Sequence, residues 1–224
     1  MSEFDLKAIA FDLDGTLIDS LPGIEFSIRA AMAQCGVRLK DIDLRSIIGP
    51  PIRVILGKLA ETADSDLIEL EGAFRRSYDS EGWSKTSIYP GTQAVLSTLR
   101  DSGIRLFVVT NKPRDISMRI LESAQIGHQF ERLITRDSRV PEYLSKREML
   151  EDLKISCGVD SSNWLVVGDT EEDGQAAAEC GMKFAHVTYG YGRISKTPAF
   201  PVCFQTSDLA RLSEWIHLEF AHDR

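Results

Sequence analysis

The sequence predicts a doubly wound α/β core with a parallel sheet, interrupted by an inserted α-helical cap domain. From about residue 90 onward, short apolar runs alternate with helical patterns, as expected of βαβ units. A long segment after the first strand carries helical patterns and no clear strand. We therefore expect a core domain over residues 1–16 and 86–224 and a helical cap over residues 17–85.

The predicted core strands are short runs with apolar centres, which is typical of strands buried on both faces of a parallel sheet. They cover residues 7–14, 104–110, 130–135, 163–168 and 182–188.

The core helices are predicted from apolar residues at helical spacing and from residues that begin or end helices. Pro113 suits the first turn of one helix, and Gly181 suits the residue after another. Ser145 and Glu148 have the spacing of a capping box, which places Lys146 at the first position of a helix. The last helix is expected over residues 207–220.

The segment after the first strand contains three groups of apolar residues at helical spacing, so we expect three or four amphipathic helices there. Pro22 suits the first turn of the first helix. The groups are Ile24, Ile28, Met32 and Cys35; Ile52, Ile55, Leu56 and Leu59; and Leu67, Leu70, Phe74 and Tyr78.

The composition of the chain indicates which kinds of molecule it does not bind and in which compartment it is found. The net charge of -8 argues against nucleic acid or an anionic membrane surface, because both reward a basic face. No apolar run approaches the ~18 residues of a membrane span. The four cysteines form no C-x-x-C pair, and the beginning of the chain lacks a signal-peptide pattern. These features indicate a cytoplasmic protein with free thiols.

The most informative motif is Asp12-Leu13-Asp14-Gly15-Thr16, which follows the first apolar run. Carboxylates spaced i, i+2 at the end of a strand point to the same side, and Gly15 lets the chain turn away. Two neighbouring carboxylates are unfavourable unless a cation lies between them. The motif therefore indicates a metal site with a nucleophile and an acid/base partner.

Two other strand ends and one helix start carry residues that suit the same chemistry. Thr110-Asn111-Lys112 follows the second strand, and Gly168-Asp169 with Asp173 follows the fourth. Lys146 opens a helix between them. Because ligands bind at the carboxyl ends of strands in open parallel sheets, these residues form a coherent set for phosphoryl transfer.

The set resembles the haloacid dehalogenase-like (HAD) phosphohydrolase superfamily, and in particular its phosphoglycolate phosphatase-like members with a helical cap. The D-x-D-G-T motif matches Asp12 to Thr16, the strand-ending Thr matches Thr110, and G-D-x-x-x-D matches Gly168 to Asp173. The resemblance covers nearly the whole chain, including the place of the cap.

The resemblance implies a mechanism for the first motif. Asp12 would be the nucleophile that forms an aspartyl-phosphate. Asp14 would protonate the leaving oxygen and then deprotonate the attacking water. Mg²⁺ would be held by Asp12, the backbone carbonyl of Asp14 and Asp169, because it prefers oxygen ligands.

The resemblance also implies roles for the later motifs. Thr110 and the backbone amide of Asn111 would hold phosphoryl oxygens. Lys146 would neutralise the charge that develops during transfer. Asp173 would hold Lys146 or a metal-bound water.

One departure concerns the lysine of the third motif. Many phosphoglycolate phosphatase-like members carry it in a Lys-Pro pair soon after the third strand, where this chain has Arg139-Val140-Pro141. A subset places it at a helix start, as Ser145-Lys146-Arg147-Glu148 does. The sequence favours Lys146 for this role and leaves Arg139 as the competitor, which also weakens the assignment to phosphoglycolate.

Several residues have a plainer interpretation beside the functional one. Lys112 and Arg114 are interpreted as solvated, although they lie near the expected phosphate. Segments similar to the Gly49-Pro50-Pro51 turn of the cap face the active site in the phosphoglycolate phosphatase-like members, so the resemblance implies that Arg53, just after this turn, would bind a second anionic group of the substrate. A solvated arginine on a helix face is the alternative.

The sequence therefore predicts a Mg²⁺-dependent phosphatase acting on a small phosphorylated metabolite, with phosphoglycolate as the leading substrate. Three alternatives use the same machinery: a 5′-nucleotidase, a sugar-phosphate phosphatase, and a phosphomutase of the β-phosphoglucomutase type. A non-catalytic binding protein with this fold is disfavoured, because the catalytic set is intact.

Overall fold

The computed structural model describes residues 5–48, 50–60 and 64–220. The chain divides into two compact units, one formed by Met1–Ile18 with Ile88–Arg224 and the other by Asp19–Ser87. Strands β2 (Ile18–Asp19) and β3 (Ser87–Ile88) pair where the chain passes from one unit to the other.

The larger unit is built on a six-stranded sheet with the order β5-β4-β1-β6-β7-β8, whose strand pairs are parallel. β1 comes first in the chain and lies between β4 and β6, so the strand order reverses beside it. The strands are β1 (Ala8–Phe11), β4 (Arg105–Thr110), β5 (Arg132–Thr135), β6 (Trp164–Gly168), β7 (Lys183–Val187) and β8 (Phe204–Thr206).

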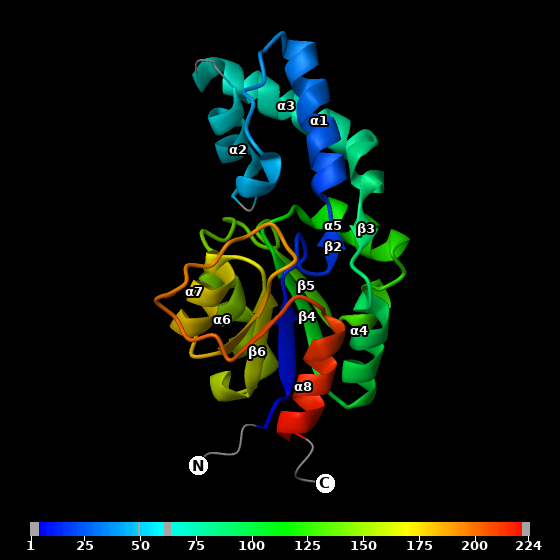
Figure 1. Cartoon of the computed structure of the whole chain (residues 1–224), viewed down its shortest axis with the longest axis vertical. Helices are drawn as coiled ribbons and strands as arrows, with labels where there is room; N and C mark the ends of the chain where they lie inside the picture. Colours follow the sequence, from blue (N-terminus) through cyan, green and yellow to red (C-terminus); the bar gives the residue numbers. More distant parts are fainter. Residues whose placement is uncertain (1–4, 49, 61–63, 221–224) are drawn as a thin grey trace. The chain divides into compact units, whose positions relative to one another are not determined.

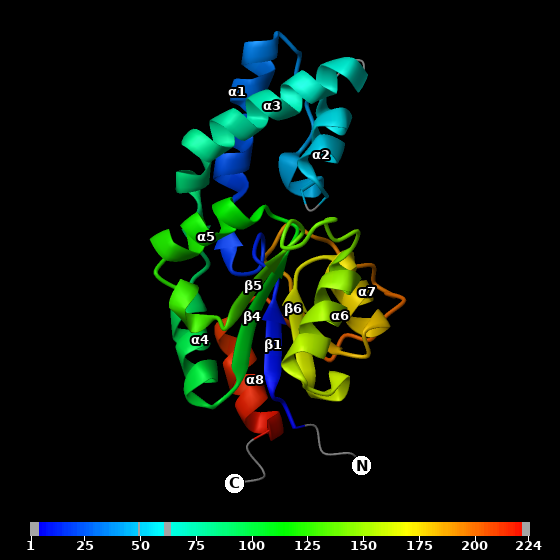
Figure 2. The ribbon, with the colours of Figure 1, turned by 180° about the vertical axis from the view of Figure 1, so that it is seen from behind.

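Helices cover both faces of this sheet. In Figures 1 and 2, α6 and α7 lie on one face, and α4 and α8 lie on the other. Alternate side chains of β1, Ala8 and Ala10, belong to the buried cluster that contains Met149 and Leu150 of α6. The helices are α4 (Thr92–Asp101), α5 (Arg114–Ser123), α6 (Lys146–Cys157), α7 (Glu171–Glu179) and α8 (Ala210–Phe220). The predicted doubly wound α/β fold is confirmed.

The two-residue strands β2 and β3 were not predicted from the sequence. In the six-stranded sheet, the structure differs from the prediction mainly at β1 and β8. The first strand ends at Phe11 rather than at residue 14, because the chain turns at once after Asp12. β8 was not predicted, since this edge strand has only three residues, of which only Thr206 is buried, and they give no apolar run.

The smaller unit is helical, with α1 (Leu21–Cys35), α2 (Ile52–Leu59) and α3 (Asp64–Ser80). Its core contains buried apolar residues from each helix, among them Ile28, Leu56 and Leu70. α1 carries a proline in its first turn and is followed by Gly36, whose φ of 64° is left-handed and suits glycine.

The shorter 3-10 turns are Leu44–Ser46, Gly82–Lys85, Gly127–Gln129 and Ser161–Asn163. Within the part of the chain that the structure describes, no helix has the length and apolar character needed to cross a membrane.

Candidate active site

The turn after β1 is tightly hydrogen bonded. The Leu13 carbonyl accepts from the N–H groups of Thr16, Leu17 and Ile18, and the Asp12 N–H donates to the Val167 carbonyl of β6 at 2.9 Å. Gly15 has a φ of 84°, and a Cβ at this position would collide with the Asp169 carboxylate. Glycine is therefore required here both for its conformation and for the close approach of the two strand ends.

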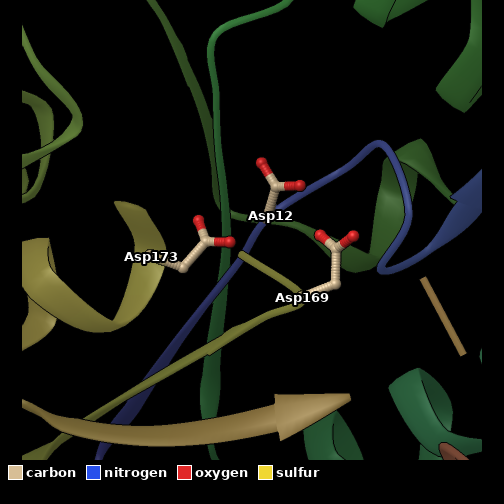
Figure 3. A group of neighbouring side chains, drawn as sticks. All are labelled: Asp12, Asp169 and Asp173. Atoms are coloured by element: carbon tan, nitrogen blue, oxygen red, sulfur yellow. The ribbon is translucent and has the colours of Figure 1, made fainter. Parts of the chain in front are cut away.

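Three buried carboxylates meet at this end of the sheet, as Figure 3 shows. Asp12 follows β1, Asp169 follows β6, and Asp173 lies in the first turn of α7. Ligand oxygens of the three lie within 4.8 Å of one another. Such a group is electrostatically unfavourable unless positive charge is close by.

Lys146 supplies one positive charge to this group. It is the first residue of α6 and only 4% exposed, and its Nζ lies 2.7 Å from Asp12 Oδ1 and 2.5 Å from Asp173 Oδ1. Burial by itself lowers the pKa of Lys146, but the negative charges of Asp12 and Asp173 outweigh it and raise the pKa well above its ordinary value. This lysine is therefore a permanent cation beside Asp12.

The negative charge of the three carboxylates is larger than the single positive charge of Lys146. Burial raises the pKa of Asp12 well above its ordinary value, and Asp173 and Asp169 raise it further against the opposing effect of Lys146. Burial, with the charge of Asp173, also raises the pKa of Asp169 to about 6. A second cation at this position would offset the repulsion among the three carboxylates, which contributes to the raised pKa values of Asp12 and Asp169.

Backbone donors hold Asp169. Its Oδ2 accepts from the N–H groups of Tyr191 at 2.7 Å and Gly192 at 2.8 Å, in the loop after β7. Thr16 Oγ1 lies 3.4 Å from the other oxygen, Oδ1. A Cβ at Gly190 or Gly192 would collide with Asp169. This loop was not predicted from the sequence, although two glycines spaced i, i+2 after an apolar strand indicate a close backbone approach.

Asp173 makes two kinds of contact, one that caps helix α7 and one with Lys146. Its Oδ2 accepts from the Thr170 N–H at 3.0 Å and from Thr170 Oγ1 at 2.6 Å, while the Thr170 hydroxyl accepts from the Asp173 N–H. This is a complete capping box at the start of α7. Its Oδ1 meanwhile accepts from Lys146, so one carboxylate both begins a helix and holds the buried cation.

The predicted capping box at α6 is only half formed. The Ser145 hydroxyl accepts from the Glu148 N–H, as predicted. The Glu148 carboxylate, however, accepts from the Leu144 N–H and from Arg139. It is drawn away from the Ser145 backbone by the charge of the arginine.

The end of β4 places a second lysine in the site. Thr110 is buried, and its Oγ1 accepts from the Lys112 N–H at 3.2 Å. The Asn111 side chain donates to Glu172 at 3.0 Å. Lys112 Nζ donates to Asp14 Oδ1 at 2.9 Å, and the Lys112 side chain is only 7% exposed. The interpretation of Lys112 as solvated is therefore wrong, whereas Arg114 is exposed.

Arg139 does not take the place of Lys146. Its guanidinium donates to Glu148 at 2.6 Å and to Asp152 at 3.1 Å, and it lies over the Tyr143 ring. The charge of Arg139 is therefore paired with carboxylates of α6, and its side chain packs on the loop that precedes this helix. Of the two candidates, it is Lys146 that contacts Asp12.

Arg53 lies in the helical unit, on α2, where its guanidinium is 3.6 Å from Glu71 and its side chain is 49% exposed. Gly49, which precedes this helix in the sequence, lies outside the described residues.

Comparisons with known proteins agree with the geometry. The family described as haloacid dehalogenase-like hydrolase matches residues 9–187. The tyrosine-protein kinase PtkA of Mycobacterium tuberculosis is 34% identical over 190 residues, which cover 84% of this chain and 64% of that protein. This chain thus spans less than two thirds of that relative.

A phosphoglycolate phosphatase of Aquifex aeolicus is 30% identical over 217 residues, which cover 96% of this chain and 100% of that protein. Among solved structures, a haloacid dehalogenase-like family hydrolase from Streptococcus pneumoniae has a TM-score of 0.85 with 22% identity, over 94% of this chain and 98% of that one. This likeness shows a common fold.

Proposed function

Because the chain belongs to the haloacid dehalogenase-like hydrolase family, we propose that it is a Mg²⁺-dependent phosphatase of a small phosphate monoester, with phosphoglycolate as the leading substrate. The relative from Aquifex aeolicus, which aligns along its whole length with this chain, is named a phosphoglycolate phosphatase. We place the enzyme in the cytoplasm, because its four cysteines are free thiols.

The observation that carries the proposal is the position of Lys146 between Asp12 and Asp173, next to Asp169. A carboxylate at a strand end with a permanent cation beside it suits attack on a phosphorus atom, because the cation offsets the charge of the approaching phosphate.

The proposed reaction has two steps. Asp12 attacks phosphorus, the bond between phosphorus and the leaving oxygen breaks, and that oxygen takes the bond's electron pair and a proton from Asp14. Asp14 then takes a proton from water, whose oxygen attacks the phosphorus of the aspartyl-phosphate. Inorganic phosphate leaves and the Asp12 carboxylate is restored. Thr110 and the Asn111 backbone amide would orient the phosphoryl oxygens.

The residues present fit a magnesium ion. The site offers only oxygen ligands, which Mg²⁺ prefers, and its carboxylates lack sufficient positive charge without it. Asp12, Asp169 and the backbone carbonyl of Asp14 would hold the ion, which would screen the phosphate charge when bound. Both oxygens of Asp173 already accept hydrogen bonds, so this residue fits the positioning of Lys146 better than direct ligation.

A second candidate follows from the relative that is named a tyrosine-protein kinase. In such an enzyme the phosphoryl group would pass to a tyrosine hydroxyl instead of water. The nucleotidase, sugar-phosphate phosphatase and phosphomutase alternatives share the same residues. For Arg53, the proposed contact with a second anionic group of the substrate rests on the sequence alone.

The test is phosphate release from a panel of monoesters, with Mg²⁺ and with EDTA. The panel contains phosphoglycolate, nucleoside monophosphates, hexose phosphates and 2-hydroxyethyl phosphate, and a parallel reaction contains ATP with a tyrosine peptide. Metal-dependent release that is fastest with phosphoglycolate supports the proposal. Transfer to the peptide without release would favour the kinase, and conversion of one sugar phosphate into another would favour the mutase.

A further inference from the structure

Lys112 starts from a well-defined backbone position at the carboxyl end of the sheet. It follows Thr110 and Asn111 at the end of β4 and precedes Pro113, the residue before α5. Its N–H donates to the Thr110 hydroxyl at 3.2 Å, and its carbonyl accepts from the Ser117 hydroxyl at 3.4 Å. These contacts on both sides fix where the side chain begins.

The side chain of Lys112 is buried almost as deeply as that of Lys146. The side chains of these two lysines are 7% and 5% exposed, whereas those of Lys7, Lys85 and Lys154 in other described ion pairs are 53%, 36% and 21% exposed. Lysine is rarely buried in this way, because its ammonium loses hydration. A buried ammonium at a ligand-binding edge therefore suits recognition of an anion.

The two buried lysines contact different carboxylates. Lys146 contacts Asp12, the proposed nucleophile, and so lies on the side of the phosphoryl group. Lys112 contacts Asp14, whose carboxylate has to reach the leaving oxygen in the proposed reaction. A cation bonded to Asp14 is therefore close to the leaving group.

We propose that Lys112 binds a carboxylate of the leaving group, so that the enzyme prefers phosphate esters of small 2-hydroxy acids to esters of neutral alcohols. This inference rests on the proposed phosphatase function and deepens it. A carboxylate one carbon away from the ester oxygen lies within reach of a cation that contacts Asp14. A neutral alcohol of the same size gives the ammonium no charge to bind.

The experiment compares two substrates of similar size, phosphoglycolate and 2-hydroxyethyl phosphate, in the Mg²⁺-loaded enzyme. In Lys112→Met, we expect kcat/KM for phosphoglycolate to fall about 10- to 100-fold more than kcat/KM for 2-hydroxyethyl phosphate, since a charge-assisted hydrogen bond is lost. Lys112→Arg should keep most of the preference. Lys146→Met should lower both values alike, because the phosphoryl group is common to both substrates.

Lys154→Met is the matched control, since this lysine lies on α6 and pairs with Glu151. It should leave the ratio of the two kcat/KM values unchanged. Thermal unfolding checks that each variant is folded, and Lys112→Gln serves if Lys112→Met does not fold.

Equal losses on both substrates in Lys112→Met would overturn the proposal and show that Lys112 only positions Asp14. So would a wild-type enzyme that hydrolyses both substrates equally well, or one that hydrolyses other monoesters but neither of these. A wild-type enzyme that releases phosphate from no monoester would instead count against the phosphatase function itself.

Discussion

The ammonium nitrogen of Lys146 lies 2.7 Å from Asp12 Oδ1, although 134 positions separate the two residues in the chain. The helix start of α6 and the end of the central strand are thus joined by one buried ion pair. Arg139, seven positions before Lys146, makes its ion pairs with Glu148 and Asp152 instead. Because only Lys146, of these two residues, contacts Asp12, substitutions of Lys146 and Arg139 should have different effects on activity.

We expect Lys146→Met to lower kcat by at least about 100-fold, because the positive charge beside the proposed nucleophile Asp12 is lost. The same change should reduce the free energy of unfolding by about 3 kcal/mol, since Asp12 and Asp173 remain buried without their cation. Arg139→Met breaks only partly exposed ion pairs and should cost about 1 kcal/mol or less, with kcat within about threefold of wild type. Steady-state kinetics and urea unfolding measure both. A loss of turnover in Arg139→Met as large as in Lys146→Met would contradict the assignment.

Asp12→Asn should reduce turnover by at least about a thousandfold, because an amide does not attack phosphorus as a carboxylate does. The metal-free variant should nevertheless be at least as stable as the wild type, since the substitution removes one of three mutually repelling carboxylates. Phosphate release and thermal unfolding in EDTA measure the two effects. Asp152→Asn, on the exposed side of α6, is the control. Full activity in Asp12→Asn would rule out this residue as the nucleophile.

The stabilising effect of Mg²⁺ should depend on pH. Burial and the charge of Asp173 raise the pKa of Asp169 to about 6 in the metal-free protein, while the pKa of Asp in an unfolded chain is about 4. The folded protein therefore holds a proton that the unfolded chain releases. The resulting stability is present below about pH 4 and is lost as the pH rises through about 6. Mg²⁺ requires the deprotonated carboxylate, so it has most to contribute above that pH.

We therefore expect saturating Mg²⁺ to raise Tm by several degrees at about pH 7.5 and by much less at about pH 5. Thermal unfolding with Mg²⁺ and with EDTA at both pH values tests this. The same shift at both pH values would show that Asp169 does not titrate in this range, and no shift at the higher pH would argue against the metal site.

Gly190→Ala should weaken metal binding although it replaces no side chain of the site. A Cβ at Gly190 would collide with the Asp169 carboxylate and the Gly15 carbonyl. We expect the Mg²⁺ concentration for half-maximal activity to rise about tenfold, since a group that orients a ligand is displaced. Gly127→Ala is the control, because the nearest atom to its Cβ would be Leu121 Cβ at 3.6 Å, an ordinary contact. Similar metal dependence in both variants would mean that the loop gives way without moving Asp169.

The sequence was sufficient for those features that are carried by side-chain identity and strand position. The parallel sheet follows from short apolar runs, and the set of Asp12, Thr110 and Asp169 follows from polar residues at strand ends. Lys146 was favoured because Ser145 and Glu148 indicate a helix start, where a subset of the superfamily that the chain resembles carries this lysine. These signals are local, so they can be seen without knowing which distant segments meet.

Other features depend on contacts that no local pattern records. Lys112 looks like a solvated lysine before a proline, and only the approach of Asp14, 98 positions away in the chain, explains its burial. The Asp169 carboxylate is fixed by the backbone N–H groups of Tyr191 and Gly192. Every residue except proline has such a group, so the residue types do not reveal these hydrogen bonds. Neither feature changes the composition or the hydrophobic periodicity, so neither could be predicted from them.

Because of the capping box of α7, enzymatic activity depends on whether the first turn of this helix is folded. The carboxylate of Asp173 that starts this helix through Thr170 is also the one that holds Lys146. Fraying of one helical turn would therefore release the lysine while the sheet is still intact. Turnover should consequently vanish at a lower urea concentration than the loss of overall structure, and activity becomes a sensor of the first stage of unfolding.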